Sequence, residues 1–566
     1  MPNPWWKESV IYQIYPRSFC DSNGDGIGDL RGILTRLDYL KLLGVDVIWL
    51  SPVYQSPNVD NGYDISDYQQ IMPEFGTLVD WEELLREIHR GGMRLVMDLV
   101  VNHTSDQHTW FQQARHSKKN PYRDYYIWRP PRDGKEPNNW AAHFGGSAWT
   151  LDPQSGEYYL HLFTPQQPDL NWENPRLRQE IYTMMRWWLD KGIDGFRMDV
   201  INMLSKVDGL PDAPVLDTRP YQYAGKHFIN GPRLFEYLEE MKREVLSRYD
   251  VMTVGETPDV NTRDGIRFTH PQTGVMSMLF QFEHMHLDKR PDDTSSRRSV
   301  HPWRLSDLKR VMSRWQNDLY ERGWNSQYLE NHDQPRSVSR FGDDGEFRVV
   351  SAKMLAIFLF MLQGTPYIYQ GQELGMTNVR FNSIEDYRDV ESLNLYQELV
   401  GEGGMQAEQA LNILHAKSRD NARTLMQWDS STNAGFTTGQ PWIKVNPNYT
   451  EINASQALSD PDSVYFTYQK LIRLRKEHPV IVHGRYELLM PEHSQVYAFT
   501  RTLGDEQWLV VLNFSREEAV FDFPDGNIYQ KPELIIANYP KEANADLSGN
   551  FLRPFEARVY WQSSPD

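Results

Sequence analysis

The stretch GFRMDVIN, residues 195–202, places an arginine and an aspartate two residues apart in an otherwise apolar segment. Side chains alternate between the two faces of a β-strand, so Arg197 and Asp199 should point the same way. The segment is too hydrophobic for a solvated surface, which predicts that both charges are buried. An adjacent guanidinium favours the charged form of a carboxylate. We therefore expect Arg197 to hold Asp199 ionised and oriented near the end of a buried strand.

Similar short apolar segments recur along the chain and alternate with amphipathic helical patterns, such as those at residues 80–92 and 178–192. Eight strands that alternate with helices favour a parallel sheet, and eight is the number that closes a barrel. The sequence thus predicts an α/β protein with a (β/α)8 TIM barrel. The expected strands are 10–16, 45–53, 93–102, 192–200, 251–256, 278–284, 324–333 and 364–373.

Two irregular regions and a change of pattern divide the chain further. Residues 104–171 follow the third strand and are too long for a simple connection, which predicts a small inserted domain over the barrel mouth. Another irregular region, 375–450, follows the eighth strand. The pattern then changes to short alternating segments, which predict a C-terminal antiparallel β-sandwich domain. The expected domains are the catalytic barrel (1–103 and 172–480), the inserted domain (104–171) and the C-terminal domain (481–566).

Composition narrows the class of protein. The chain has 566 residues, a net charge of −18 and one cysteine. Its acidity argues against nucleic acid or an anionic membrane as a partner, and a lone Cys20 cannot form an internal disulfide. There is no basic-then-apolar leader, and no apolar run reaches the ~18 residues of a membrane span. We expect a cytoplasmic monomer.

Polar side chains gather where the predicted strands end. The carboxyl ends of barrel strands form one rim, and active sites lie there. A lone Asp at such a position is commonly a helix cap, and a lone His or Arg is more often structural. Coincidence over five strands is harder to explain, so we expect one concave site. Its members would be Tyr63, Asp64, Asn102, His103, Arg197, Asp199, Glu256, His332 and Asp333.

Several carboxylates with aromatic neighbours match the needs of glycosidic bond cleavage. One carboxylate attacks the sugar carbon, a second protonates the leaving oxygen, and negative charge stabilises the oxocarbenium-like transition state. The acid has to be protonated at working pH, so its surroundings must raise its pKa.

Over essentially its whole length the chain resembles the oligo-1,6-glucosidase and α-glucosidase branch of the α-amylase superfamily, glycoside hydrolase family 13. The motifs that carry this resemblance are DLVVNH (98–103), GFRMDVIN (195–202), VGET (254–257), ENHDQPR (330–336), QPDLN (167–171), DNGYDISDY (60–68) and SRDNAR (418–423).

The resemblance implies a role for each matching residue. Asp199 would be the nucleophile, Glu256 the general acid/base and Asp333 the transition-state stabiliser. Family members retain the anomeric configuration, so Asp199 and Glu256 should lie ~5–5.5 Å apart. Tyr63 would be the stacking platform under the terminal glucose. The residues that resemble those fixing this glucose are Asp64, His103, Arg197, His332 and Arg419.

Substrate choice is less sharply indicated. Val200, directly after the nucleophile, resembles the branch that cleaves α-1,6 links, and a β-branched side chain there would narrow the aglycone side. Ordinary strand packing is the alternative explanation. An α-1,4 or broad preference, a dextran glucosidase and a trehalose-6-phosphate hydrolase remain alternatives. A silent sugar sensor is disfavoured because all three catalytic carboxylates are present.

The loop DSNGDGIGD, residues 21–29, offers oxygen ligands at alternate positions, like the first half of an EF-hand loop. Its twelfth position is Gly32 rather than Glu, and a plain Asx-rich turn is the alternative. The family carries calcium in this loop, sometimes replaced by magnesium, so we expect a structural Ca²⁺ and no organic cofactor. The expected ligands are Asp21, Asn23, Asp25, the Ile27 carbonyl and Asp29.

Three positions depart from the family pattern: Glu330, Gln372 and Leu425. Glu330 precedes the NHD motif and lies near the predicted site in sequence. We expect it to affect the aglycone subsite or the pKa of Glu256. Gln372 and Leu425 would affect only loop rigidity and subsite polarity.

Overall fold

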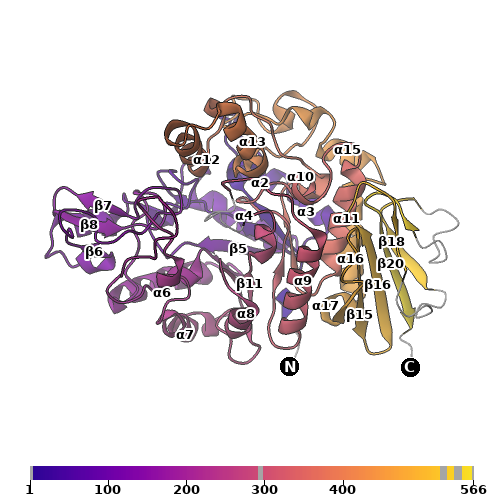
Figure 1. Cartoon of the computed structure of the whole chain (residues 1–566), viewed down its shortest axis with the longest axis horizontal. Helices are drawn as coiled ribbons and strands as arrows, with labels where there is room; N and C mark the ends of the chain where they lie inside the picture. The colour runs from indigo at the N-terminus through magenta and orange to yellow at the C-terminus, as the bar shows by residue number, and fades with distance from the viewer. Residues whose placement is uncertain (1–3, 291–296, 523–531, 541–550, 564–566) are drawn as a thin grey trace.

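The computed structural model describes residues 4–290, 297–522, 532–540 and 551–563. Eight parallel strands form one sheet in the order β11-β10-β9-β5-β2-β1-β13-β12, and a bridge between Leu279 and Asn325 joins its two ends. The sheet therefore closes, and the predicted barrel is confirmed (Figure 1). Its strands are β1 (Ile11–Ile14), β2 (Val47–Leu50), β5 (Arg94–Leu99), β9 (Gly195–Met198), β10 (Met252–Glu256), β11 (Met278–Phe280), β12 (Ser326–Gln327) and β13 (Thr365–Tyr369).

Each predicted strand contains one of these, but the observed strands are shorter. The largest difference is at 324–333, where β12 spans only two residues. Its pairing with β13 is limited to Ser326 with Thr365 and Gln327 with Pro366. His332 and Asp333 therefore lie in a loop beyond the strand.

Helices surround the barrel, and both predicted helical patterns are confirmed. The helix at 78–90 begins with a capping box between Thr77 and Asp80, and the helix at 175–190 has Asn174 as its N-cap followed by Pro175. The helices up to the last barrel strand are α1 (Trp5–Glu8), α2 (Leu30–Thr35), α3 (Leu37–Leu43), α4 (Leu78–Arg90), α5 (Thr109–His116), α6 (Pro175–Asp190), α7 (Leu234–Glu244), α8 (Thr262–Thr269), α9 (Leu305–Leu319), α10 (Ser337–Phe341) and α11 (Arg348–Met361).

The region after the third barrel strand carries a sheet of its own. Strands β6 (Trp128–Arg129), β7 (Trp149–Asp152) and β8 (Glu157–Leu160) form an antiparallel sheet in the order β6-β8-β7. Trp140, Trp149 and Leu160 belong to a separate buried cluster that also includes Phe228. In Figure 1 this sheet lies at the opposite end of the molecule from the C-terminal strands. A further short pair, β3 (Tyr54–Gln55) and β4 (Asp67–Ile71), lies in the loop after β2.

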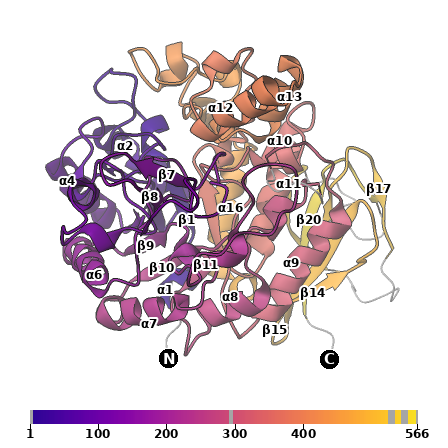
Figure 2. The same ribbon diagram turned by 60° about the vertical axis from the view of Figure 1, so that its left-hand side comes forward.

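The C-terminal strands form two antiparallel sheets, one of five strands ordered β14-β15-β16-β20-β18 and one of two, β17-β19. Apolar residues of both sheets, among them Val511 and Leu552, share one buried cluster, so the predicted β-sandwich is confirmed (Figure 2). The strands are β14 (Arg485–Leu489), β15 (Val496–Leu503), β16 (Glu506–Asn513), β17 (Ala519–Val520), β18 (Glu533–Ala537), β19 (Phe551–Leu552) and β20 (Ala557–Ser563).

Between the barrel and this sandwich the chain is helical and irregular. The helices are α12 (Val390–Tyr396), α13 (Ala407–Lys417), α14 (Asp420–Arg423), α15 (Ala454–Ser459), α16 (Val464–Glu477) and α17 (Pro479–His483). Among the described residues, no helix is long and apolar enough to cross a bilayer.

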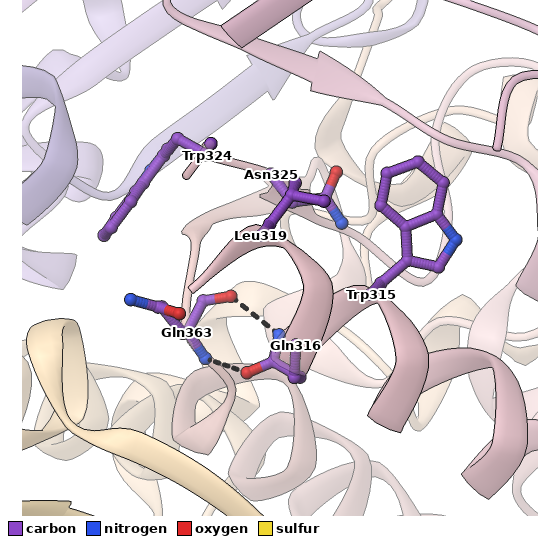
Figure 3. Close-up of a pocket in the computed structure, with 7 residues that line it drawn as sticks. Trp315, Gln316, Leu319, Trp324, Asn325 and Gln363 are labelled. Carbon is purple, nitrogen blue, oxygen red and sulfur yellow. Dashed lines mark hydrogen bonds between the residues drawn. The ribbon is translucent and has the colours of Figure 1, made fainter. Parts of the chain in front are cut away.

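A small cavity of about 10 Å³ lies at the N-terminal end of β12, where Gln316 and Gln363 exchange two hydrogen bonds (Figure 3). Both polar atoms of the Asn325 side chain lack a partner there. The space suits one water molecule and is too small for a sugar. It lies at the end of the barrel opposite the rim where the predicted site residues gather.

Candidate active site

A single buried guanidinium joins three carboxylates at the C-terminal ends of the barrel strands. Arg197, which is 1% exposed, donates to Asp98 Oδ1, Asp199 Oδ1 and Glu256 Oε2, each at 2.7 Å. The backbone permits this contact because Gly195 lets β9 approach β10, where a Cβ would lie 2.0 Å from the Met252 carbonyl oxygen. The two charges of the GFRMDVIN motif are thus buried together, as predicted.

Aromatic rings connect this group to the third predicted carboxylate. The Tyr63 ring lies 5.7 Å from the Arg197 guanidinium and stacks on His332, with centroids 5.2 Å apart and an interplanar angle of 8°. His332 Nε2 is 3.2 Å from Asp333 Oδ2, and His332 Nδ1 is 2.8 Å from Gln13 Nε2. Burial lowers the pKa of His332 to about 3, so this imidazole is neutral and acts as a hydrogen-bonding group.

A second group of charges surrounds Asp333. Arg423 Nη2 and Arg419 Nη1 donate to Asp333 Oδ1 at 2.8 and 3.3 Å. Arg419 also contacts Asp60 at 3.0 Å and Asp389 at 2.6 Å. The Asp333 carboxylate therefore accepts two guanidinium groups, and Arg297 donates to its backbone carbonyl, whereas Asp199 and Glu256 share one cation with Asp98.

This difference in surroundings separates the three pKa values. Burial raises the pKa of Glu256 to about 8, because the charges of Asp199 and Asp333 reinforce desolvation against Arg197. Burial raises the pKa of Asp199 to about 6, although Arg197 opposes the shift. For Asp333, burial is outweighed by the charges of Arg419, Arg423 and Arg297, which lower its pKa. At pH 7 the site therefore combines a protonated Glu256 with ionised Asp199 and Asp333.

Arg197 thus holds Asp199 in place, and Asp199 is ionised at pH 7, although its pKa lies above the usual range. The physical reason for the raised pKa is burial, which outweighs the guanidinium, and the charge of Asp98 adds to the shift. The remaining exposure is concentrated on the groups proposed to act: the side chains of Asp199, Glu256 and Asp333 are 9%, 12% and 23% exposed, against 0% for Asp98.

Comparison with known proteins identifies the family to which this chain belongs. Residues 13–484 match the alpha amylase catalytic domain, and residues 486–559 match the maltogenic amylase C-terminal domain. The chain is 61% identical to an oligo-1,6-glucosidase of Parageobacillus thermoglucosidasius over 560 residues, 99% of each chain. This chain belongs to the α-amylase family. As a member of the α-amylase family it is a glycoside hydrolase, as predicted.

Two further relatives of the α-amylase family extend the comparison. An oligo-1,6-glucosidase of Bacillus cereus is 57% identical, with 99% of this chain and 100% of that protein covered. A crystal structure of a Bacillus licheniformis trehalose-6-phosphate hydrolase has a TM-score of 0.92 at 48% identity and covers 99% of this chain and 100% of that one.

Two predicted glucose-binding residues have different surroundings in the structure. His103 is buried, with Nε2 3.2 Å from the Tyr63 carbonyl and 3.3 Å from Gln167 Nε2, so it joins the group around Tyr63. The Asp64 carboxylate instead accepts the backbone N–H groups of Val59 and Asp60. Asp64 therefore shapes its own loop, and the acid of this loop that reaches Arg419 is Asp60.

Sequence reasoning missed several members of the site. Asp98 opens the DLVVNH motif, and a buried acid in an apolar strand is the same signal that singled out Asp199. Asp60 lies in DNGYDISDY beside two other aspartates, and spacing alone could not distinguish them. Phe144 and Phe163 come from the 104–171 region: Phe144 lies 4.7 Å from the Arg419 guanidinium and Phe163 lies 5.1 Å from the His103 ring.

Val200 follows β9 in a left-handed conformation, with φ 35° and ψ 41°. This region is sparsely populated by β-branched residues, and the strain is of order 1–3 kcal/mol. The turn directs the Val200 N–H to Glu256 Oε2 at 3.2 Å. Its side chain is buried in the cluster that contains Trp140 and Phe228. Val200 is thus not a strand residue, and its side chain packs against the inserted region.

The other two positions that depart from the family pattern, Gln372 and Leu425, are held by their local surroundings. Gln372 Oε1 accepts the Tyr369 N–H at the end of β13, and Leu425 is 1% exposed in the main core.

In the 21–29 loop, Asp21, Asn23 and Asp25 each accept an N–H from the residue two positions ahead. Asp21 also accepts from Gly24 and Gly26, and Asp29 caps α2 by accepting from Gly32. These bonds suit an Asx-rich turn as well as a metal loop, so the metal site stays a prediction.

Proposed function

We propose that this protein is a retaining exo-acting α-glucosidase that hydrolyses terminal α-1,6-linked glucose from isomaltose and short isomalto-oligosaccharides. One observation carries this proposal: the carboxylates of Asp199 and Glu256 both accept the Arg197 guanidinium at 2.7 Å at the rim of the barrel, where burial raises the pKa of Glu256 above that of Asp199. The oligo-1,6-glucosidase relatives, at 57–61% identity over nearly the whole chain, support the linkage.

The geometry supports a double displacement. In the first step an oxygen of Asp199 attacks the anomeric carbon while Glu256 gives its proton to the glycosidic oxygen, which leaves with the aglycone. In the second step Glu256, now ionised, takes a proton from water, which displaces Asp199 from the glucosyl ester. Asp333 stays ionised throughout and stabilises the developing positive charge. Arg197 orients both reacting carboxylates.

The test is a comparison of kcat/KM on isomaltose, panose, maltose, sucrose and trehalose 6-phosphate. Isomaltose should be the best of the disaccharides. Trehalose 6-phosphate is the informative rival because a relative at 48% identity is named for it. A preference for trehalose 6-phosphate or maltose over isomaltose would refute the proposed linkage while leaving the glycoside hydrolase in place.

We expect Val200 to set the choice of linkage. Val200→Thr should raise the ratio of maltose to isomaltose cleavage by up to about 10-fold, since a hydroxyl in place of a methyl changes the wall of the aglycone side without changing its volume. The ratio of kcat/KM values is the measurement. Val215→Thr, at a position 78% exposed, is the control and should leave the ratio unchanged. If Val200→Thr leaves the ratio as unchanged as Val215→Thr does, the Val200 side chain has only a packing role.

The pH dependence of kcat/KM should be bell-shaped with a maximum near pH 7. Asp199 must be ionised, so activity falls as the pH drops through about 6, and Glu256 must be protonated, so activity falls as the pH rises through about 8. The profile is measured on an aryl α-glucoside from pH 4 to 10. An alkaline limb well below pH 7 would contradict the assignment of Glu256 as the acid.

We also propose a structural Ca²⁺ in the 21–29 loop, with Mg²⁺ as an alternative, held by Asp21, Asn23, Asp25, the Ile27 carbonyl and Asp29. The oxygen donor set supports a hard cation. Millimolar Ca²⁺ should raise Tm by about 2 °C or more relative to EDTA, because the metal binds only the folded state. Asp25→Ala should abolish this difference. Equal Tm values of the unaltered protein in Ca²⁺ and EDTA would favour the metal-free turn.

The remaining proposals concern the context of the enzyme. We propose a cytoplasmic monomer with domain boundaries near residues 103, 171 and 480. A single cysteine fits a reducing compartment. The separate family match from residue 486 and the start of β14 at Arg485 support the last boundary. Size-exclusion chromatography with light scattering tests the monomer.

A further inference from the structure

The loop that carries His332 and Asp333 is closed at its base by a buried ion pair. Glu330 Oε1 accepts Arg336 Nη1 at 3.1 Å, and Glu330 Oε2 accepts the Ser337 N–H at 2.5 Å. Glu330 is 2% exposed and Arg336 is 0% exposed. Both ends of a seven-residue segment, 330–336, are thereby held together away from solvent.

The same guanidinium reaches the helix that supplies the cations around Asp333. Arg336 donates to the Gln370 carbonyl at 2.7 Å and to the Ala422 carbonyl at 3.2 Å. Ala422 directly precedes Arg423, which donates through Nη2 to Asp333 at 2.8 Å and through Nε to the His332 carbonyl at 3.0 Å. Arg336 therefore contacts both the loop that carries Asp333 and the helix that binds it.

Asp333 needs such support because no strand ladder fixes it. β12 ends at Gln327, six residues earlier. Within the loop, Asn331 Oδ1 accepts the Asp333 N–H at 2.8 Å, which orders only the turn itself. The turn is also tied to the barrel through His332, whose ring contacts Gln13 of β1 and whose carbonyl accepts Arg423 Nε, while Glu330 and Arg336 hold its two ends.

We propose that Glu330 and Arg336 are positioning residues that set the place of Asp333 relative to Arg419 and Arg423. This inference rests on the proposed function, in which Asp333 stabilises the transition state. It replaces the expectation that Glu330 acts on the aglycone subsite or on Glu256, since both Glu330 oxygens are bound at the base of the loop. The pair touches no substrate and acts through Asp333 alone.

Replacement of Glu330 tests the proposal through the balance of kcat and KM. Glu330→Ala should lower kcat on an aryl α-glucoside about 100-fold, because small misplacements of a reacting group are costly. Glu330→Gln keeps an acceptor for the Ser337 N–H and should lower kcat only about 10-fold. KM should change by less than about threefold in both variants, since Asp333 acts mainly in the transition state.

A matched pair in the C-terminal sheet provides the control. Glu556 is 2% exposed, accepts Arg558 Nε at 2.7 Å and accepts the Arg553 N–H at 2.8 Å, so it combines a guanidinium and a backbone partner as Glu330 does, with the Arg553 side chain as a second cation. Glu556→Gln should lower Tm about as much as Glu330→Gln while leaving kcat unchanged. If Glu330→Gln and Glu556→Gln lower Tm equally and both keep normal kcat, the pair of Glu330 and Arg336 has only a structural role and the inference fails.

The unaltered enzyme and Asp333→Asn separate this inference from the proposed function. An unaltered enzyme that does not cleave α-glucosides refutes the function itself. An active enzyme that Asp333→Asn inactivates, with a Glu330→Gln variant of normal kcat, refutes only the positioning role. If Glu330→Ala does not fold, Glu330→Gln and Arg336→Lys decide, and Arg336→Lys should also lower kcat because one ammonium cannot bridge Glu330 and the Ala422 carbonyl.

Discussion

Replacing Asp199 with alanine should lower kcat/KM on an aryl α-glucoside by at least about 10⁴-fold, because the glucosyl ester can no longer form. The fold should survive. Arg197 keeps Asp98 and Glu256 as partners, and the substitution removes a carboxylate whose pKa is raised by burial. Circular dichroism and thermal unfolding check the fold, and steady-state kinetics checks the activity.

Azide provides a control for this result. A small anion in the space left by Asp199 should restore turnover and yield a β-glucosyl azide, since attack comes from the side of the missing carboxylate. A variant that keeps near-normal turnover without azide would show that Asp199 is not the nucleophile. Lost turnover together with a lost fold would show instead that Asp199 is needed for the buried charge group.

The fold and the rim of the site could be predicted because each depends on local pattern. Apolar strands alternate with amphipathic helices, and this alternation predicts the barrel. Polar residues follow the strands, and their positions predict that Asp199, Glu256 and Asp333 lie at one rim. The strand ends carry the chemistry because side chains there point toward the open rim rather than into the packed core.

What could not be predicted depends on side-chain direction and shared charge. DNGYDISDY contains three aspartates within eight residues, and only the loop conformation shows that Asp64 binds backbone N–H groups while Asp60 faces Arg419. The pKa of Asp199 depends on its burial and on the charges around it, one of which, Asp98, lies about 100 positions away. The spacing of residues along the chain shows neither the direction of these side chains nor the surroundings that set the pKa of Asp199.

Replacing Arg197 with methionine should have the second largest effect, and it should appear in both stability and activity. The substitution leaves Asp98, Asp199 and Glu256 buried together without their shared cation. Breaking a buried ion pair in this way costs about 3–5 kcal/mol. At pH 7 Asp199 would then be largely protonated, and kcat/KM should fall at least about 10³-fold.

The pH dependence distinguishes this cause from a general loss of packing. In the variant the folded-state pKa values of the three acids rise further above their unfolded values. The folded state is therefore destabilised at pH values where these acids are ionised in the unfolded state. That destabilisation shrinks as the pH falls and the acids take up protons. The Tm difference between Arg197→Met and the unaltered enzyme should therefore be smaller at pH 5 than at pH 7.5, and the acid limb of kcat/KM should move to higher pH.

Arg178 supplies the comparison, since it is also buried and donates to Glu240 at 2.9 Å and to the Trp172 carbonyl at 2.8 Å, outside the carboxylate group. Arg178→Met should lower Tm while leaving the acid limb of the profile in place. If both variants keep the limb of the unaltered enzyme, Arg197 does not control the ionisation of Asp199. The difference between the pKa of Glu256 and the pKa of Asp199 would then depend on burial alone.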